Sequence, residues 1–65
     1  MQYVEIKEAM ILKKTGGAVL IEVDDEEHWV PWSCVEDNGE DFRVGTRGTI
    51  YISEWIAERE GIEYE

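Results

Sequence analysis

Short runs of alternating apolar and polar residues constrain the fold of this chain more than any other feature. The clearest run has Val19, Ile21 and Val23 at alternate positions. Successive side chains of a β-strand point to opposite faces, so this run predicts a strand with one buried face. An acidic turn at residues 24–27 and a return run at residues 28–32 then predict a β-hairpin.

Runs on either side of the hairpin predict further elements. Residues 3–12 are mostly apolar at even positions but are interrupted at Glu8, which predicts one strand with a bulge near Glu8, or else two short strands. A β-branched and aromatic run at residues 49–52 predicts another strand. A final helix is expected to begin after Ser53, its N-cap, and to end at Gly61.

The segment between the hairpin and the last strand is less regular. Ser33 and Glu36 stand at the spacing of a capping box, which predicts one helical turn. The polar, glycine-containing stretch at residues 37–48 predicts a loop with a short strand at residues 42–44. Three apolar side chains are expected to anchor the final helix to the rest of the fold: Trp55, Ile56 and Ile62.

These elements predict a mainly β fold: a small bent antiparallel sheet or a partly open Src-homology-3-like barrel, with a short C-terminal helix. Residues 1–65 are expected to form a single small domain, because a chain of 65 residues has room for one hydrophobic core. The single cysteine cannot close an internal disulfide. Stability is therefore expected from dense apolar packing or from a partner chain.

The chain has 16 acidic and 6 basic residues, for a formal net charge of -10. Such a charge is common in disordered chains, but 43% of the residues are hydrophobic and fall in strand-like runs, so a folded domain is expected. An acidic surface repels phosphate backbones and anionic membranes and attracts basic proteins. We therefore expect no membrane association and no binding to duplex nucleic acid. A lone cysteine favours a reducing, cytoplasmic location.

The residues do not predict an enzyme. Cys34 and His28 are the sole thiol and imidazole, but six residues of extended chain would separate them by about 20 Å. Cys34 is therefore interpreted as a buried structural thiol. The carboxylates fall in turns and near the chain ends, where water solvates them, and they do not follow the calcium-loop pattern. We expect no catalytic residue, no metal site and no cofactor.

Surplus tryptophan beside a carboxylate cluster is the strongest functional signal. Trp29 and Trp32 would point to opposite faces of a strand, so at least one is expected to be exposed, and exposed tryptophan is enriched at interaction hot spots. Together with Asp25, Glu26 and Glu27, these rings are the predicted partner-binding residues. The leading hypothesis is a non-enzymatic acidic module that binds a basic protein partner.

Other hypotheses remain open. Clustered carboxylates could mimic DNA phosphates and inhibit a nuclease or another DNA-binding protein of a host. Exposed aromatic rings could instead stack the bases of a single-stranded nucleic acid. Exposed rings and open sheet edges could also pair two copies of the chain into a homodimer.

Three segments carry a resemblance to a known group of proteins: residues 18–23, 27–33 and 48–57. They follow an A-[VI]-L-[VI] strand, a W-[VI]-P-x-S turn and an E-W-[IL]-A helix, a pattern that resembles small uncharacterised β-rich proteins of bacteriophages and bacteria. The match covers about residues 9–62. The resemblance implies a compact barrel in a bacterial or phage-infected cytoplasm and no particular activity. Trp32 stands where the pattern more usually has a polar or basic residue, which predicts an additional exposed ring.

Overall fold

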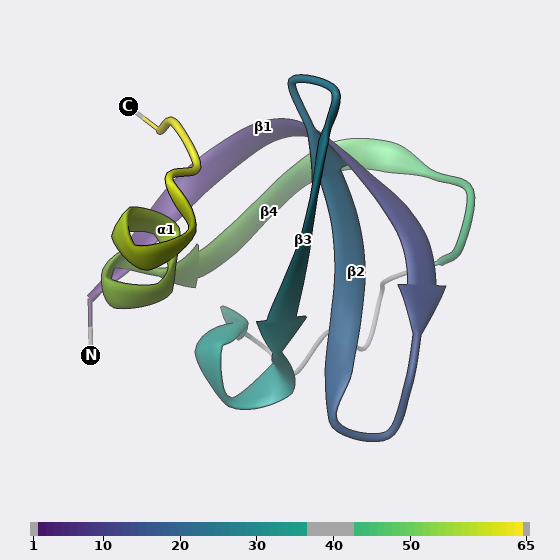
Figure 1. Cartoon of the computed structure of the whole chain (residues 1–65), viewed down its shortest axis with the longest axis horizontal. Helices are drawn as coiled ribbons and strands as arrows, with labels where there is room; N and C mark the ends of the chain where they lie inside the picture. Colours follow the sequence, from purple (N-terminus) through teal and green to yellow (C-terminus); the bar gives the residue numbers. More distant parts are fainter. Residues whose placement is uncertain (1, 37–42, 65) are drawn as a thin grey trace.

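The computed structural model describes residues 2–36 and 43–64. The elements in these residues follow in the order β1 Tyr3–Lys14, β2 Ala18–Val23, β3 Glu26–Pro31, η1 Trp32–Cys34, β4 Arg47–Ser53 and α1 Glu54–Glu60. The strands form one antiparallel sheet in the order β3-β2-β1-β4. The sheet is bent and open, and α1 lies against its concave side (Figure 1). The predicted mainly β fold, a bent antiparallel sheet with a C-terminal helix, is confirmed.

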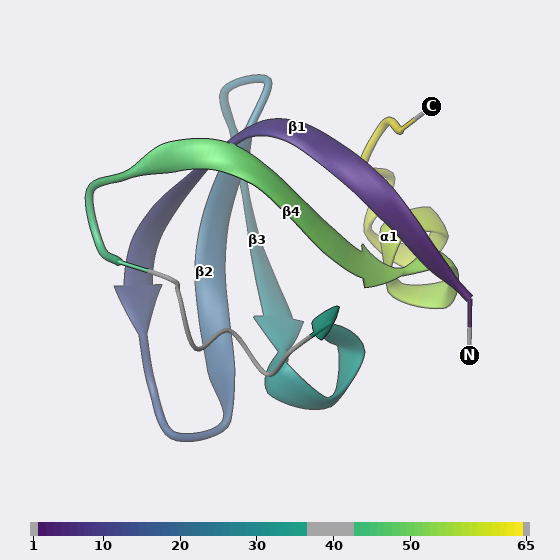
Figure 2. The ribbon, with the colours of Figure 1, turned by 180° about the vertical axis from the view of Figure 1, so that it is seen from behind.

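The long strand β1 belongs to both halves of the sheet. Its first half pairs with β4, from Tyr3 opposite Ser53 to Ile6 opposite Ile50. Its second half pairs with β2, and Met10 lies opposite residues of both neighbouring strands. Seen from behind, β4 runs beside the first half of β1, while β2 and β3 lie beyond the bend (Figure 2). The bend therefore joins a β1–β4 pair to a β1–β2–β3 meander.

A β-bulge at Glu8 accompanies the bend. The register of β1 against β4 shifts between Ile6 and Ala9, and Glu8 has a φ of 58°, in the left-handed region that side chains rarely adopt. The extra residue moves the buried face of β1 from Val4 and Ile6 to Ala9 and Ile11. The prediction of one strand with a bulge is confirmed. The even-numbered apolar face does not continue as the buried face beyond it.

β2 and β3 form a tight hairpin. Val23 lies opposite Glu26, so the turn consists of Asp24 and Asp25, with φ of 52° and 66°. Positive φ at both central residues is the type I′ geometry, which matches the twist of a two-stranded hairpin. The turn is shorter than the predicted one, because Glu26 and Glu27 belong to β3.

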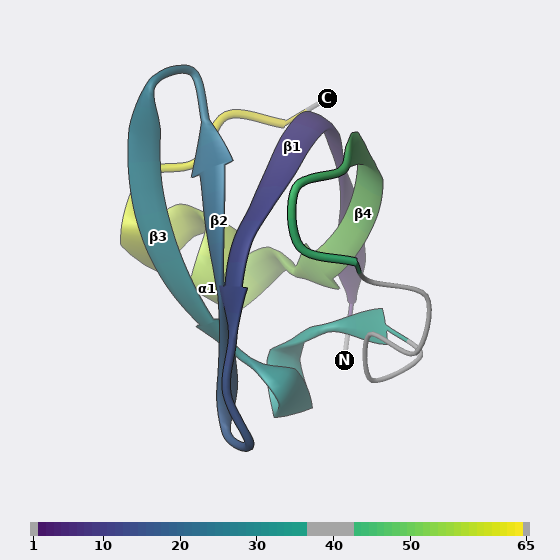
Figure 3. The ribbon, with the colours of Figure 1, turned by 90° about the vertical axis from the view of Figure 1, so that its right-hand side faces the viewer.

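The core is aliphatic and lies on the inner face of the sheet. Figure 3 looks onto the strands with α1 behind them, on the side where the core lies. The buried hydrophobic residues are Val4, Ile6, Ala9, Ile11, Val19, Ile21, Val23, Val30, Cys34, Val35, Ile50, Ile52, Ile56, Ala57 and Ile62. No phenylalanine, tyrosine or tryptophan ring is buried among the described residues, and Trp32 packs against the core while staying partly exposed. The large rings are thus left for the surface.

Helix α1 has the predicted ends. The Ser53 hydroxyl accepts a hydrogen bond from the backbone N–H of Trp55 at 3.2 Å, and Gly61 ends the helix with a φ of 71°. Ile56 and Ala57 are buried against the sheet. Trp55 is 59% exposed, so its predicted role as an anchor is wrong. Ile56 and Ala57 form the buried side of this short helix, and Trp55, the residue before them, therefore faces outward.

The connection after β3 differs from its prediction. One 3₁₀ turn forms as expected, but Pro31 stands at its N-cap and no side chain caps it, so the capping box at Ser33 is wrong. Val35 then forms an isolated bridge with Ile52 of β4. Of the strand predicted at residues 42–44, Phe42 lies outside the described residues and the other two belong to no strand.

Candidate protein-interaction face

The outer side of the β2–β3 hairpin carries an exposed ring at its centre. Trp29 is 46% exposed and lies opposite Leu20, which is partly buried. The next outward pair is Glu22 opposite Glu27, and Met10 of β1 lies opposite Glu22 on its other side. Directly opposed residues of antiparallel strands share one face of the sheet. We call these five residues the Trp29 face.

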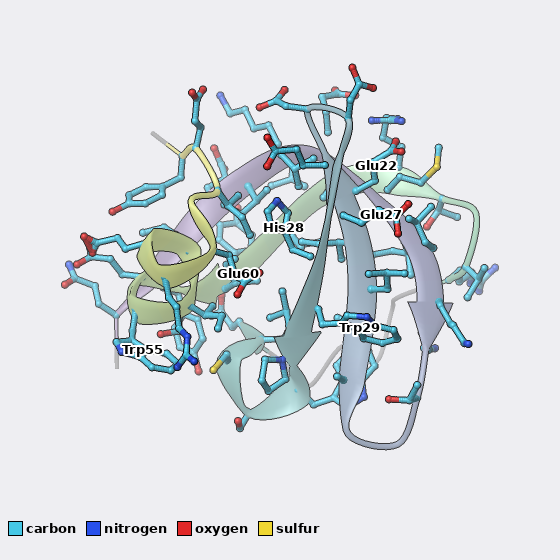
Figure 4. The ribbon with its side chains drawn as sticks, viewed as in Figure 1. Glu22, Glu27, His28, Trp29, Trp55 and Glu60 are labelled. Carbon is cyan, nitrogen blue, oxygen red and sulfur yellow. The ribbon has the colours of Figure 1, made fainter. Side chains whose placement is uncertain are left out.

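The alternation of β3 determines which side chains reach this face. His28 and Val30 are buried, so Glu27 and Trp29 between them point outward. Figure 4 shows Trp29, Glu22 and Glu27 on the side of the hairpin away from α1. The Trp29 face is therefore a direct product of strand alternation in the hairpin.

Two like charges face each other beside the ring. Glu22 and Glu27 are directly opposed, an arrangement that destabilises a strand pair. The Arg47 guanidinium lies 3.4 Å from the Glu22 carboxylate and also donates a hydrogen bond to the Glu8 carbonyl at 2.9 Å. Both partners of this ion pair are substantially exposed, so it contributes little to stability. The repulsion across β2 and β3 is only partly offset.

Trp32 does not belong to this face. Its indole N–H donates a hydrogen bond to the Thr15 carbonyl at 2.7 Å, and its ring packs against the core. Trp32 was expected to add an exposed ring, but it is only partly exposed, because it follows the inward-pointing His28 and Val30 in the strand alternation and then enters η1. Trp32 instead links the end of β3 to the connection between β1 and β2.

The two remaining predicted residues lie at or next to the hairpin turn. Asp25 is exposed in the turn itself. The Glu26 side chain is 74% exposed, and its carboxylate lies 3.8 Å from the His28 ring. Of the predicted residues, the structure thus brings Trp29 and Glu27 together on the outer face and places Asp25 and Glu26 at the tip. The sequence prediction did not include Glu22, although its alternation with Ile21 and Val23 could have revealed it.

His28 is a buried polar residue whose surroundings the sequence did not predict. Its Nδ1 lies 3.3 Å from the Glu60 carboxylate of α1, and its ring is 8% exposed. Figure 4 shows the two side chains pointing toward each other between β3 and the helix. The contact joins residues 32 positions apart, so the sequence alone could indicate only that the His28 side chain points inward. It ties the C-terminal end of α1 to β3.

Candidate chemistry elsewhere in the described part of the chain is sparse. Cys34 is a free, buried thiol, and no hydrogen bond joins it to His28. Residues 2–36 and 43–64 contain no group of three or more histidine, cysteine, aspartate or glutamate side chains placed to hold a metal ion. The same residues contain no helix with the length and apolar character that crossing a bilayer requires.

Other exposed rings have different surroundings from Trp29. Trp55 on α1 has the Arg59 guanidinium above its ring, 5.2 Å from the centroid, a cation–π contact. The Tyr51 hydroxyl donates a hydrogen bond to the Glu5 carboxylate at 3.2 Å. This hydrogen bond, together with the negative charge of Glu5, raises the pKa of Tyr51 above its usual value.

Comparisons with known proteins were made over the whole chain. No family model, no curated protein and no solved structure matches it. The functional argument therefore depends on the geometry of the chain's own residues.

Proposed function

We propose that this domain is a non-enzymatic acidic interaction module, of phage or bacterial origin, that binds a basic protein partner through the Trp29 face and the acids of the hairpin turn. The observation that carries this proposal is the exposed Trp29 ring beside two directly opposed carboxylates. The opposed carboxylates lower the stability of the free domain, which supports a role for them outside folding.

The ring supplies the apolar part of such an interface. Trp29 lies directly opposite Leu20, which is partly buried, so a partner would cover two neighbouring apolar side chains rather than an isolated ring. Tryptophan is among the residues most often found at the centre of binding hot spots. Removing it from such a centre commonly costs 2 kcal/mol or more, about thirtyfold in affinity.

The carboxylates supply the charge complementarity. A lysine or arginine of the partner between Glu22 and Glu27 would replace a repulsive pair by two attractive contacts, and so relieve a cost that the free domain carries. Asp25 and Glu26 extend the negative surface to the hairpin tip. Association with a basic surface would be accelerated by this field and weakened by salt.

The proposal is tested by capturing partners from bacterial lysate, identifying them by mass spectrometry and titrating the purified partner. Trp29→Ala and the pair Glu26→Lys with Glu27→Lys are each expected to weaken binding at least tenfold. Trp55→Ala is the matched control, because it removes an exposed ring from another part of the surface. It is expected to change affinity less than twofold.

Three results would contradict the proposal: equal losses from Trp29→Ala and Trp55→Ala, affinity that does not change between low and high salt, or a captured partner with an acidic surface. Quenching of tryptophan fluorescence by a single-stranded oligonucleotide at low salt would instead indicate the nucleic-acid hypothesis.

A further inference from the structure

β3 is an edge strand with a free outer side. It is the terminal strand of the sheet order and forms the left border of the sheet in Figure 3. In the described residues, no backbone hydrogen bond joins Glu27 or Trp29 to a segment outside the β2–β3 hairpin. Unpaired N–H and C=O groups along an edge are a template for an additional strand.

The hairpin turn fixes which backbone groups face this free side. In a two-residue hairpin the residues flanking the turn, Val23 and Glu26, form a hydrogen-bonded pair, and bonded and non-bonded pairs then alternate. If the alternation is continued along the hairpin, Gly17 and Trp32 should also form a hydrogen-bonded pair. The Trp32 N–H does donate a hydrogen bond to the Gly17 carbonyl, at 3.2 Å. The backbone groups of Glu27 therefore point away from β2, as do those of Trp29.

The charges along this edge select its occupant. The turn and the first two residues of β3 contribute four consecutive acids, residues 24–27, and no basic residue. Glu60 adds a carboxylate on the inner side of β3, next to His28. A second copy of the chain would bring the same acids against these, which disfavours self-pairing of β3. A strand rich in lysine or arginine would meet opposite charge on both of its faces.

We propose that the basic partner docks as an added β-strand: an extended lysine- or arginine-containing segment pairs with the free edge of β3, through the outward backbone groups of Glu27 and Trp29. This inference rests on the proposed function and specifies how that partner is recognised. Backbone pairing supplies affinity, while side chains that lie beside Trp29 and Glu27 supply specificity.

Proline scanning tests the backbone pairing. Glu27→Pro removes an outward N–H without removing a hydrogen bond to β2, and Pro31 already occupies the equivalent phase. Glu27→Ala is the matched control, since it loses the same charge but keeps the N–H. The probe is a capped eight-residue peptide of alternating lysine and valine. We expect the peptide to bind Glu27→Pro at least fivefold more weakly than Glu27→Ala, in an NMR titration.

Amide hydrogen exchange in the unsubstituted protein provides a second measurement, which decides the matter if Glu27→Pro fails to fold. The peptide is expected to slow exchange of the Glu27 and Trp29 amides at least fivefold. Equal affinities of the two variants together with unprotected amides, while the Trp29 indole signal still shifts, would overturn strand addition and leave the proposed function standing. No response of Trp29 to millimolar peptide, with no basic partner captured from lysate, would overturn both.

Discussion

The two sides of the β2–β3 hairpin follow different rules. On the inner side, pairs such as Val19 and Val30 are fully buried and aliphatic. On the outer side, Trp29 is 46% exposed and Glu22 opposes Glu27. Packing explains aliphatic pairs such as Val19 and Val30, but it does not explain the exposed Trp29 ring or the two opposed carboxylates. The difference teaches that the core leaves the outer side of the hairpin free to vary, and this is the side on which we propose that a partner binds.

Truncating one side chain on each side of β2 would test this contrast most strongly. Ile21→Ala is expected to lower the free energy of unfolding by about 2–4 kcal/mol, because Ile21 is fully buried. A domain of this size has only about 3–5 kcal/mol in total, so the variant would be partly unfolded. Leu20→Ala, on the outer side, is expected to cost about 1 kcal/mol or less. Urea unfolding measures both. Similar losses would mean that the outer side is part of the core.

A substitution at the bulge would sharpen the same comparison, because the bulge decides which residues of β1 face inward. Glu8→Gly is expected to raise the free energy of unfolding by about 0.5–1 kcal/mol, since glycine adopts the φ of 58° without steric cost. Lys7→Gly, one position earlier and without a positive φ, is expected to lower it by a similar amount. Destabilisation by Glu8→Gly would show that the left-handed geometry is not the source of strain.

Charge reversal on the outer side is expected to separate stability from binding. Glu27→Lys places opposite charges across β2 and β3, so the free energy of unfolding should rise by about 0.2–1 kcal/mol at low salt while affinity for a basic partner falls. Glu63→Lys makes the same change in net charge near the chain end and serves as the control. Thermal unfolding at low and high salt measures the effect. A loss of stability in Glu27→Lys alone would contradict the repulsion between Glu22 and Glu27.

The smallest expected effect is the titration of Tyr51, away from the hairpin. The hydrogen bond to Glu5 raises the pKa of Tyr51, so the folded state holds the phenol proton more tightly than the unfolded chain does. The stability that this contributes is complete below pH 10 and is lost as pH rises through the raised pKa. Glu5→Gln should return the pKa of Tyr51 toward 10 in an absorbance titration, with Tyr51→Phe to identify the signal. An unchanged titration curve in Glu5→Gln would refute this coupling.

Local sequence patterns predicted the elements that depend on neighbouring residues. Strand alternation located β2, the interruption at Glu8 located the bulge, and the preferences of Ser53 and Gly61 located the ends of α1. The type I′ turn was harder to predict, because two aspartates carry a weaker positive-φ signal than asparagine and glycine do.

Features that depend on contacts between residues far apart in the chain could not be predicted from the sequence. The partner of His28 is Glu60, on another element, and no spacing rule connects the two. Trp32 was expected outside, yet its indole N–H bonds the Thr15 carbonyl across the base of the hairpin. Large rings are usual core residues, so the exposure of Trp55 could be predicted only by knowing that aliphatic side chains already fill the interior.

The pairing of β1 with β4 has a consequence for the order of folding during synthesis. Tyr3 pairs with Ser53, whereas the second half of β1 pairs with β2 a few residues further along the chain. The meander of β1, β2 and β3 can therefore assemble early on the ribosome, while Val4 and Ile6 wait without their partners until β4 has emerged. The bulge at Glu8 divides β1 into a half that folds with β2 and a half that must wait for the synthesis of β4.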